Sequence, residues 1–300
     1  KVKIIDLDSN ERPIAVMINN NKAVWGYQAG LQDAYIVYEM IVEGGITRMM
    51  AVFKGANPSR IASVRSSRHY YLDYAMENDA IYAHIGWSPR AQSDISSLRI
   101  NAINANNSGA FTWDNTLRVA TEHRAYTTIE RVKEAAEKKG YSLTTEQKSL
   151  LTYQVKPVDM KSVEGVIKAD DTIKIPYSTS HVTSFIYDLV NKVYKRYQNN
   201  REHKDMITGL QYTAKNIITY KVYNYTLNDG YSGGRQDLKN IGSGEGYYIT
   251  EGYAIPITWE KSSRSAQTIY KVKATGKELV VNDGNTFIEI QPQAMANPTI

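Results

Sequence analysis

The residues with the clearest potential for chemistry are basic side chains in a stretch without acids. Residues 44–72 contain no Asp or Glu, and their basic residues are Arg48, Lys54, Arg60, Arg65 and Arg68. Arg65 and Arg68 lie where an extended segment meets the expected start of a helix, so their guanidinium groups would add bidentate donors to free backbone N–H groups. This arrangement suits a phosphate or a carboxylate. The alternative is that both arginines pair with acids such as Glu39 and Glu43 to hold a sheet together.

Two carboxylates precede this stretch. Glu39 and Glu43 are four residues apart, so both could lie on one face of a helix, or on one face of a strand by its period of two. Beside Arg48 they could form an acid–base pair for catalysis or a metal clamp. A purely structural ion-pair network is the alternative.

Two histidines are further candidates. His84 follows the strand-like run 80–83, and ligands of open α/β sheets collect at the carboxyl edge of the strands, which makes His84 the first candidate for catalysis. His123, close to Arg118 and Arg124, is the second. A single histidine is more often a structural residue, and that alternative stays open for both.

Familiar catalytic motifs are missing from the chain. There is no cysteine, which excludes disulfides, thiol nucleophiles, zinc thiolate sites and iron–sulfur clusters. The 5 histidines show no metal-ligand spacing, and no G-x-S-x-G, H-E-x-x-H or P-loop occurs. The glycine-rich stretch 242–246 leads into a strand-like run, whereas a phosphate loop would lead into a helix. We therefore expect neither a metal nor a cofactor.

Strands and helices alternate in the first half of the chain. Strand-like apolar runs cover 14–18, 36–42, 47–53 and 80–83, with a hairpin expected at Gly44-Gly45. Helices are expected after the N-cap candidates Ser66 and Ser67, after Ser88-Pro89, and over 127–139 with Gly140 at its end. Residues 1–160 therefore predict an α/β domain with a mostly buried sheet.

The second half has a different pattern. From about residue 170, strand-like runs follow one another, separated by turns such as 228–230 and 282–284. More than half of the 23 tyrosines lie here, which is typical of half-buried strand faces. Residues 161–300 predict a β-rich (α+β) domain. We expect the domain break between 155 and 170, where Pro157 and a polar stretch interrupt the strand pattern.

Composition and charge exclude several classes of protein. A chain of 300 residues with 42% hydrophobic and 22% charged residues is globular and long enough for two domains. The net charge of +5 is shared by both halves, so neither half is typical of a nucleic-acid binder. No apolar run approaches the roughly 18 residues needed to cross a bilayer, and no signal peptide opens the chain. We expect either a cytosolic protein or the mature part of an exported one.

Several sequence blocks in order resemble the YerB-like family of Gram-positive lipoproteins, which has two consecutive domains of unknown function. In the first half these blocks are Arg12-Pro-Ile-Ala-Val-Met-Ile-Asn19, the run 36–48, Ser63-Val-Arg-Ser-Ser-Arg68 and the run 80–89. In the second half they are Tyr187-Asp188, Tyr194, Arg196, His203 with Asp205, and the runs 214–216, 258–261 and 284–289. The resemblance implies an extracytoplasmic domain pair held to the outer face of the cell membrane by an N-terminal lipid and linker.

The chain departs from the family pattern near Trp113. The family's usual His-Asn pair is His123-Arg124 here, with Asp114 and Arg118 before it. If this position contacts a ligand, the specificity of relatives does not carry over. The expected ligand-binding residues are Arg48, Arg65, Arg68, Ser88, Asp114, Arg118 and His123.

Three hypotheses of function follow from these patterns. The first is an envelope protein that binds a small anion or an anionic cell-envelope polymer through the arginines of the first domain. The second is a hydrolase or transferase acting on such a polymer with Glu39, Glu43 and His84. The third is an adaptor that binds another protein through its Tyr-rich second domain. We expect no nucleic-acid partner, and membrane contact only through the lipid anchor.

Overall fold

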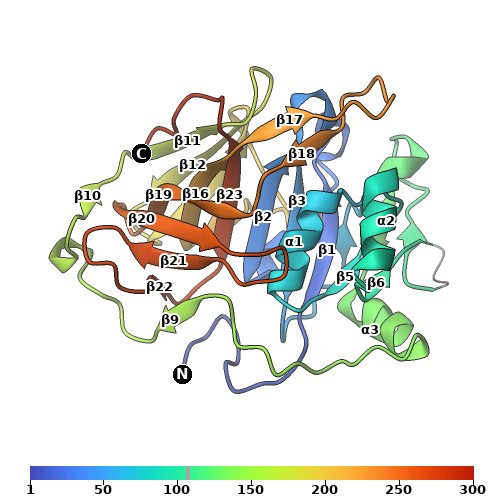
Figure 1. Ribbon diagram of the computed structural model, residues 1–300, viewed down its shortest axis with the longest axis horizontal. Helices are drawn as coiled ribbons and strands as arrows, with labels where there is room; N and C mark the ends of the chain where they lie inside the picture. The colour runs from blue at the N-terminus through green and yellow to red at the C-terminus, as the bar shows by residue number, and fades with distance from the viewer. Residues whose placement is uncertain (106–108) are drawn as a thin grey trace.

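One mixed sheet runs through both halves of the chain in the computed structural model, which describes residues 1–105 and 109–300 (Figure 1). Its eleven strands follow the order β10-β20-β19-β16-β23-β2-β3-β1-β5-β6, with β21 paired to β20. The strands from the first half are β1 (Ile14–Asn19), β2 (Ile36–Ile41), β3 (Thr47–Phe53), β5 (Ile81–Ala83) and β6 (Ala102–Ile103). Those from the second half are β10 (Ile167–Lys168), β16 (Asn216–Val222), β19 (Gly242–Thr250), β20 (Tyr253–Lys261), β21 (Ile269–Val272) and β23 (Thr286–Pro292).

Smaller sheets surround the main one. Five strands, β11 (Thr172–Pro176), β12 (Val182–Asp188), β13 (Val193–Gln198), β14 (Arg201–Glu202) and β15 (Thr213–Ala214), form the second sheet. A third sheet contains β4 (Ile61–Ala62), β7 (Thr112–Trp113) and β8 (Ala125–Thr127). Two further pairs join β9 (Thr152–Gln154) to β22 (Val280–Asn282) and β17 (Asn224–Thr226) to β18 (Gln236–Leu238).

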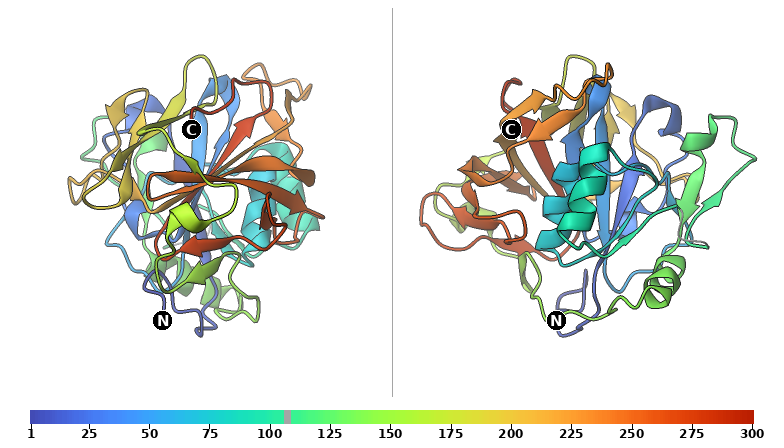
Figure 2. Two further views of the ribbon diagram at one scale, coloured as in Figure 1. Left: turned by 90° about the vertical axis from the view of Figure 1, so that its left-hand side faces the viewer. Right: turned by 45° about the vertical axis from the view of Figure 1, so that its right-hand side comes forward.

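The main sheet is covered on both faces (Figure 2). On one face lies helix α1, where Tyr38 of β2 packs against Tyr74 with 4.9 Å between ring centroids. On the other face lies the five-stranded sheet, where Glu39 bonds to Thr183 of β12 and Arg196 of β13. Successive residues of a strand point to opposite faces, so β2 separates two buried layers.

The described residues form three helices, α1 (His69–Glu77), α2 (Pro89–Ser97) and α3 (Ile129–Lys138). Helix α2 begins as expected, since Ser88 caps it and Pro89 lies in its first turn, and α3 begins at Ile129 after the N-cap Thr128, two residues later than the expected start at 127. The expected capping of α1 by Ser66 or Ser67 is wrong, because its N-cap is Arg68 and no side chain caps it. Both serines lie in an extended segment that pairs with neighbouring strands instead.

The two halves form the predicted classes, a first half with helices packed on a buried sheet and a β-rich second half. They are joined edge to edge, since β2 pairs in parallel with β23 from Ile36↔Thr286 to Met40↔Ile290. One continuous hydrophobic core contains residues of both halves. The break between 155 and 170 therefore stays a prediction about the linker, while the sheet itself crosses from one half to the other.

Candidate functional site

The carboxyl ends of β1, β2 and β5 meet at one edge of the main sheet. β1 is antiparallel to β3, which is antiparallel to β2, and β1 is parallel to β5, so all three run the same way. The segment 63–67 lies between β1 and the loop after β5: Arg65 N donates to Met17 O at 3.0 Å and Ile85 N donates to Arg65 O at 3.1 Å. These backbone bonds hold Arg65 at the edge where ligands of α/β sheets collect.

Three predicted arginines gather at this edge. Arg68 Nε donates to Glu43 Oε1 at 2.6 Å, and Arg48 Nη1 donates to Ser66 O at 2.8 Å. Within the described residues, the side chain of Arg65 makes neither a hydrogen bond nor an ion pair, although Glu122 and Glu43 attract it at longer range. We call Arg48, Arg65 and Arg68 together the basic edge.

The pKa values of these groups reflect crowding of like charges. Burial, together with the charge of Arg68, lowers the pKa of Arg48 to about 10. Burial and the same neighbour also lower the pKa of Arg65. Burial alone would raise the pKa of Glu43, but the charge and hydrogen bond of Arg68 together with the charge of Arg48 outweigh it, and the pKa of Glu43 is lowered. One ionised carboxylate, bonded to Arg68, thus lies among three guanidinium cations.

His123 lies beside the basic edge. Its Nδ1 is 2.8 Å from Asn19 Nδ2, so the ring nitrogen accepts and Asn19 donates. Burial and the charge of Arg65 lower the pKa of His123, which leaves the ring neutral at neutral pH. Asn19 was not predicted as a site residue, although its position at the end of the buried strand β1 pointed to the sheet edge where ligands collect. No sequence pattern indicated Tyr231, which lies far along the chain in the β17–β18 hairpin and influences the pKa of Arg65.

His84 and Ser88 have structural roles. His84 is fully buried, its Nδ1 donates to Gly86 O at 2.8 Å, and burial lowers its pKa to about 4. Its Nε2 has no partner within the described residues and no exposed surface. Ser88 Oγ accepts from Ala91 N at the start of α2. Neither side chain offers a free group to a ligand from solvent.

Glu39 belongs to a buried network on the opposite face of the sheet. Its Oε2 is 2.6 Å from Arg196 Nη2, and neither side chain has any exposed surface. Burial raises the pKa of Glu39, but the charge of Arg196 together with the hydrogen bond and charge of His181 outweighs this effect and holds the pKa well below its usual value. Burial and the charge of Glu39 raise the pKa of Glu289, its neighbour on β23, well above the usual value. Thr47 and Thr183 also donate to Glu39.

The predicted catalytic set of Glu39, Glu43 and His84 is therefore not brought together. Glu39 points toward β12 and β13, whereas Arg48, one residue after Thr47 on β3, lies on the α1 face with Glu43 and Arg68 close by. The separation arises because β2 ends at Ile41 and Glu43 lies in the short 3-10 turn Glu43–Gly45, where the period of two no longer applies.

Asp114 and Arg118 also lie outside the basic edge. Asp114 accepts from Arg60 at 2.7 Å, and hydrogen bonds from Thr116 and Arg60 lower its pKa to about 2. Arg118 is exposed in the loop before Thr121, and within the described residues its side chain has no hydrogen-bond or ion-pair partner. The structure thus unites four of the predicted ligand-binding residues, Arg48, Arg65, Arg68 and His123.

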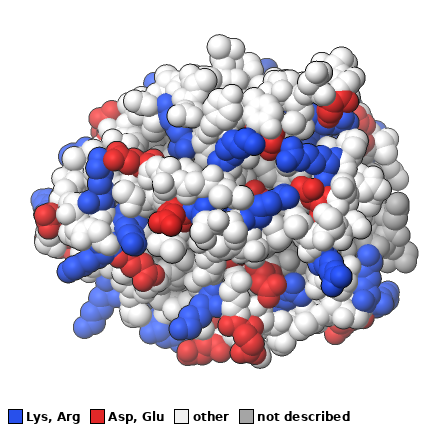
Figure 3. Space-filling view, viewed as in Figure 1, with Lys and Arg blue, Asp and Glu red and all other residues white. Residues whose placement is uncertain are grey.

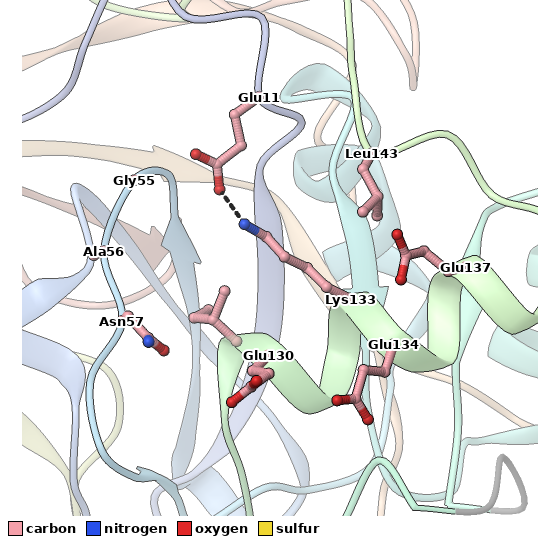
Figure 4. Close-up of a pocket in the computed structure, with 10 residues that line it drawn as sticks. Glu11, Gly55, Ala56, Asn57, Glu130, Lys133, Glu134, Glu137 and Leu143 are labelled. Atoms are coloured by element: carbon pink, nitrogen blue, oxygen red, sulfur yellow. Dashed lines mark hydrogen bonds and ion pairs between the residues drawn. The ribbon is translucent and has the colours of Figure 1, made fainter.

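A pocket of about 540 Å³ lies elsewhere, between α3 and the loop at Gly55 (Figure 4). Its walls carry four glutamates, Glu11, Glu130, Glu134 and Glu137, and Lys133 Nζ is 2.7 Å from Glu11 Oε1. None of the predicted site residues lines it. Nowhere in the described chain do three or more His, Asp or Glu side chains gather so that they could hold a metal ion.

One face of the molecule carries mixed charge. On the face seen in Figure 3, Lys and Arg side chains are interspersed with Asp and Glu. None of the described helices combines the length and apolar character that a bilayer crossing requires.

The single sheet and its basic edge define a protein of two consecutive parts that share one core. Residues 3–142 match the family described as "Protein of unknown function (DUF3048) N-terminal domain", and residues 173–288 match the corresponding C-terminal domain. The chain belongs to this DUF3048 family.

Two comparisons identify a relative. "Putative lipoprotein YerB" of Bacillus subtilis (strain 168) is 30% identical over 290 residues, which covers 95% of this chain and 82% of that protein. The crystal structure of the YerB protein from Bacillus subtilis is similar with a TM-score of 0.80 and 29% identity, covering 94% of this chain and 91% of that chain. The resemblance to YerB-like proteins and the fold class predicted from the sequence patterns are confirmed.

Proposed function

We propose that this protein is an extracytoplasmic lipoprotein whose basic edge binds an anionic ligand of the cell envelope, such as a polymer that carries phosphate or carboxylate groups. One observation carries the proposal: among the described residues, only Arg68 of the three is bonded to a carboxylate, that of Glu43, while Arg48 donates to a backbone carbonyl and the side chain of Arg65 has no bonded partner. Guanidinium groups remain charged at any physiological pH and favour planar, bidentate anions. The location rests on the relative named as a lipoprotein.

The surroundings of Arg65 support binding of an anion. Its backbone is fixed by two hydrogen bonds, so only its side chain has to be ordered when it takes up a ligand. His123 is neutral and lies beside it, with its Nδ1 already occupied by Asn19. Its Nε2 is left to donate a hydrogen bond to the same ligand.

The alternative of a hydrolase or transferase has weaker support. Glu39 and His84 are sealed from solvent, so neither could reach a polymer at the surface. The adaptor alternative has one observation in its favour, since Leu189 and Val190 in the turn between β12 and β13 are 76% and 89% exposed. A patch of two residues is small for a protein interface.

The test is calorimetric titration of the full chain with inorganic phosphate and with tripolyphosphate at low ionic strength. Removing one charge-assisted contact costs about 1.5–3 kcal/mol, so Arg65→Gln should weaken tripolyphosphate binding about tenfold or more. Binding to the unaltered protein should also weaken as salt is added, because the site is partly exposed.

The matched control is Arg201→Gln, which makes the same charge change at an exposed position of β14. Its affinity should equal that of the unaltered protein after correction for net charge. Equal affinities of Arg65→Gln and Arg201→Gln would refute the proposal, as would the absence of any phosphate binding.

A further inference from the structure

A second pocket lies in the C-terminal half. It has a volume of about 550 Å³ and lies between β16, β19, β20, β23 and the C-terminal tail. None of the basic-edge residues lines it, so it is separate from the anion site. Its size falls in the range of about 300–1,000 Å³ that is usual for small-molecule sites.

The floor of this pocket contains a buried amide with a fixed orientation. Gln291 has no exposed surface, and its Nε2 donates to Pro176 O and to Ala296 O, each at 2.7 Å. Because both donors face carbonyl oxygens, the amide cannot be flipped, and Oε1 must be the atom without a partner. A buried acceptor without a partner costs free energy, so an occupant that supplies a donor would be favoured.

A second unpartnered atom belongs to the same pocket. Thr219 of β16 is 1% exposed, and its Oγ1 has no hydrogen-bond partner within the described residues. Thr219 and Gln291 lie on the same face of neighbouring parallel strands, since Thr219 is in register with Glu289. Both residues line the pocket, but their unpartnered atoms are buried, so a ligand has to displace neighbouring side chains to bond with this acceptor and this hydroxyl.

The tail that closes the pocket is held by specific bonds. Lys221 Nζ donates to Asn297 Oδ1 at 2.8 Å, and it also donates to Met295 O. Further along, Thr299 and Lys174 exchange two backbone hydrogen bonds, at 2.9 and 3.2 Å. The wall formed by the tail is therefore ordered before any ligand binds.

The remaining walls are apolar or neutralised. Tyr247, Pro256 and Ile300 supply apolar surface. At the rim, Lys273 Nζ and Glu245 Oε2 form an ion pair at 2.8 Å, and the charge of each compensates the other. These walls favour an uncharged ligand that has an apolar face and hydroxyl groups.

We propose that this pocket binds a neutral saccharide of one or two sugar rings. The C–H face of a pyranose ring would lie on Tyr247 and Pro256, and its hydroxyl groups would donate to Gln291 Oε1 and bond with Thr219 Oγ1. A sugar fits better than a peptide, because its hydroxyl groups can donate to an acceptor and accept from a hydroxyl at any position around the ring.

Titration of the full chain with glucose, N-acetylglucosamine and cellobiose, followed by protein NMR and calorimetry, tests this site. At least one of these sugars should bind and shift the signals of Tyr247 and Gln291. Thr219→Val should weaken this binding roughly three- to tenfold, the range expected for one neutral hydrogen bond. The melting temperature of Thr219→Val should stay the same or rise, because a buried hydroxyl without a partner is removed.

Three variants act as controls. Thr172→Val makes the same change on β11, outside the pocket, and should bind the sugar normally. Tyr247→Phe keeps the ring and should retain binding, whereas Tyr247→Ala should lose it. The proposal is overturned if none of the sugars binds, if Thr219→Val binds as tightly as Thr172→Val, or if a small amide such as N-acetylglycinamide binds there and the sugars do not.

Discussion

The buried ion pair between Glu39 and Arg196 makes a sharp prediction about stability. Oε2 of Glu39 and Nη2 of Arg196 are 2.6 Å apart, and neither side chain has any exposed surface. Arg196→Met keeps much of the side-chain length but removes the cation that acts on both Glu39 and Glu289. Removing one partner of a buried pair costs about 3–5 kcal/mol. With an unfolding entropy of about 2.1 cal/mol/K per residue, this loss lowers the melting temperature by about 5–8 °C.

The pH dependence gives the prediction a second, independent part. In the unaltered protein the folded-state pKa of Glu39 lies well below the ordinary 4.5, so its contribution to stability is present above that value and is lost as the pH falls through the folded-state pKa. In Arg196→Met the pKa shift of Glu39 has the opposite sign. A buried carboxylate without a cation has a raised pKa and takes up a proton on folding, so the deficit in stability should shrink as the pH falls from about 7.5 to about 5.5.

Thermal unfolding followed by circular dichroism at several pH values measures both parts. The matched control is Arg235→Met, whose pair with Asp229 at 3.1 Å has side chains 20% and 31% exposed, so its shift should be much smaller and almost independent of pH. If Arg196→Met melts within about 1 °C of the unaltered protein at neutral pH, or if the deficit does not shrink in acid, Glu39 is not held as a buried carboxylate by Arg196.

Three further predictions concern individual elements. His84→Phe should flatten the loss of stability in acid. Burial lowers the pKa of His84 from 6.5 to about 4, so its contribution of up to about 3 kcal/mol is present above pH 6.5 and is lost as the pH falls through about 4. Parallel acid-unfolding curves of variant and parent would contradict this. Ser88→Ala should cost about 1 kcal/mol through the lost cap of α2, measured by chemical denaturation, and should leave phosphate affinity unchanged. Limited proteolysis should cut between 155 and 170, and the two fragments should remain together in gel filtration because β2 and β23 belong to one sheet; fragments that separate without denaturant would show that the shared sheet does not hold them.

Local patterns in the sequence predicted most of the secondary structure. The apolar run before Asn19 became β1, the Ser88-Pro89 pair began α2, and Gly140 with its positive φ followed α3. These signals act over a few residues, because a strand alternates with period two and a helix needs a cap and a terminator close to its ends. The acid-free stretch likewise predicted the basic edge, since Arg65 and Arg68 are close in sequence and the short segment between them leaves them close in space.

Contacts between distant segments decided the rest. The period of two predicted that Glu39 and Glu43 lie on one face, but the turn after Ile41 separates them. The cation bonded to Glu39 is Arg196, which lies 157 residues further along the chain. The same holds for the parallel pairing of β2 with β23, which converts two expected domains into one sheet. The sequence by itself determined the elements, the family and the local gathering of arginines. Which carboxylate is sealed and which edge stays open depended on the tertiary structure, because the burial of a charge is set by whatever segments pack around it, and no local pattern contains that information.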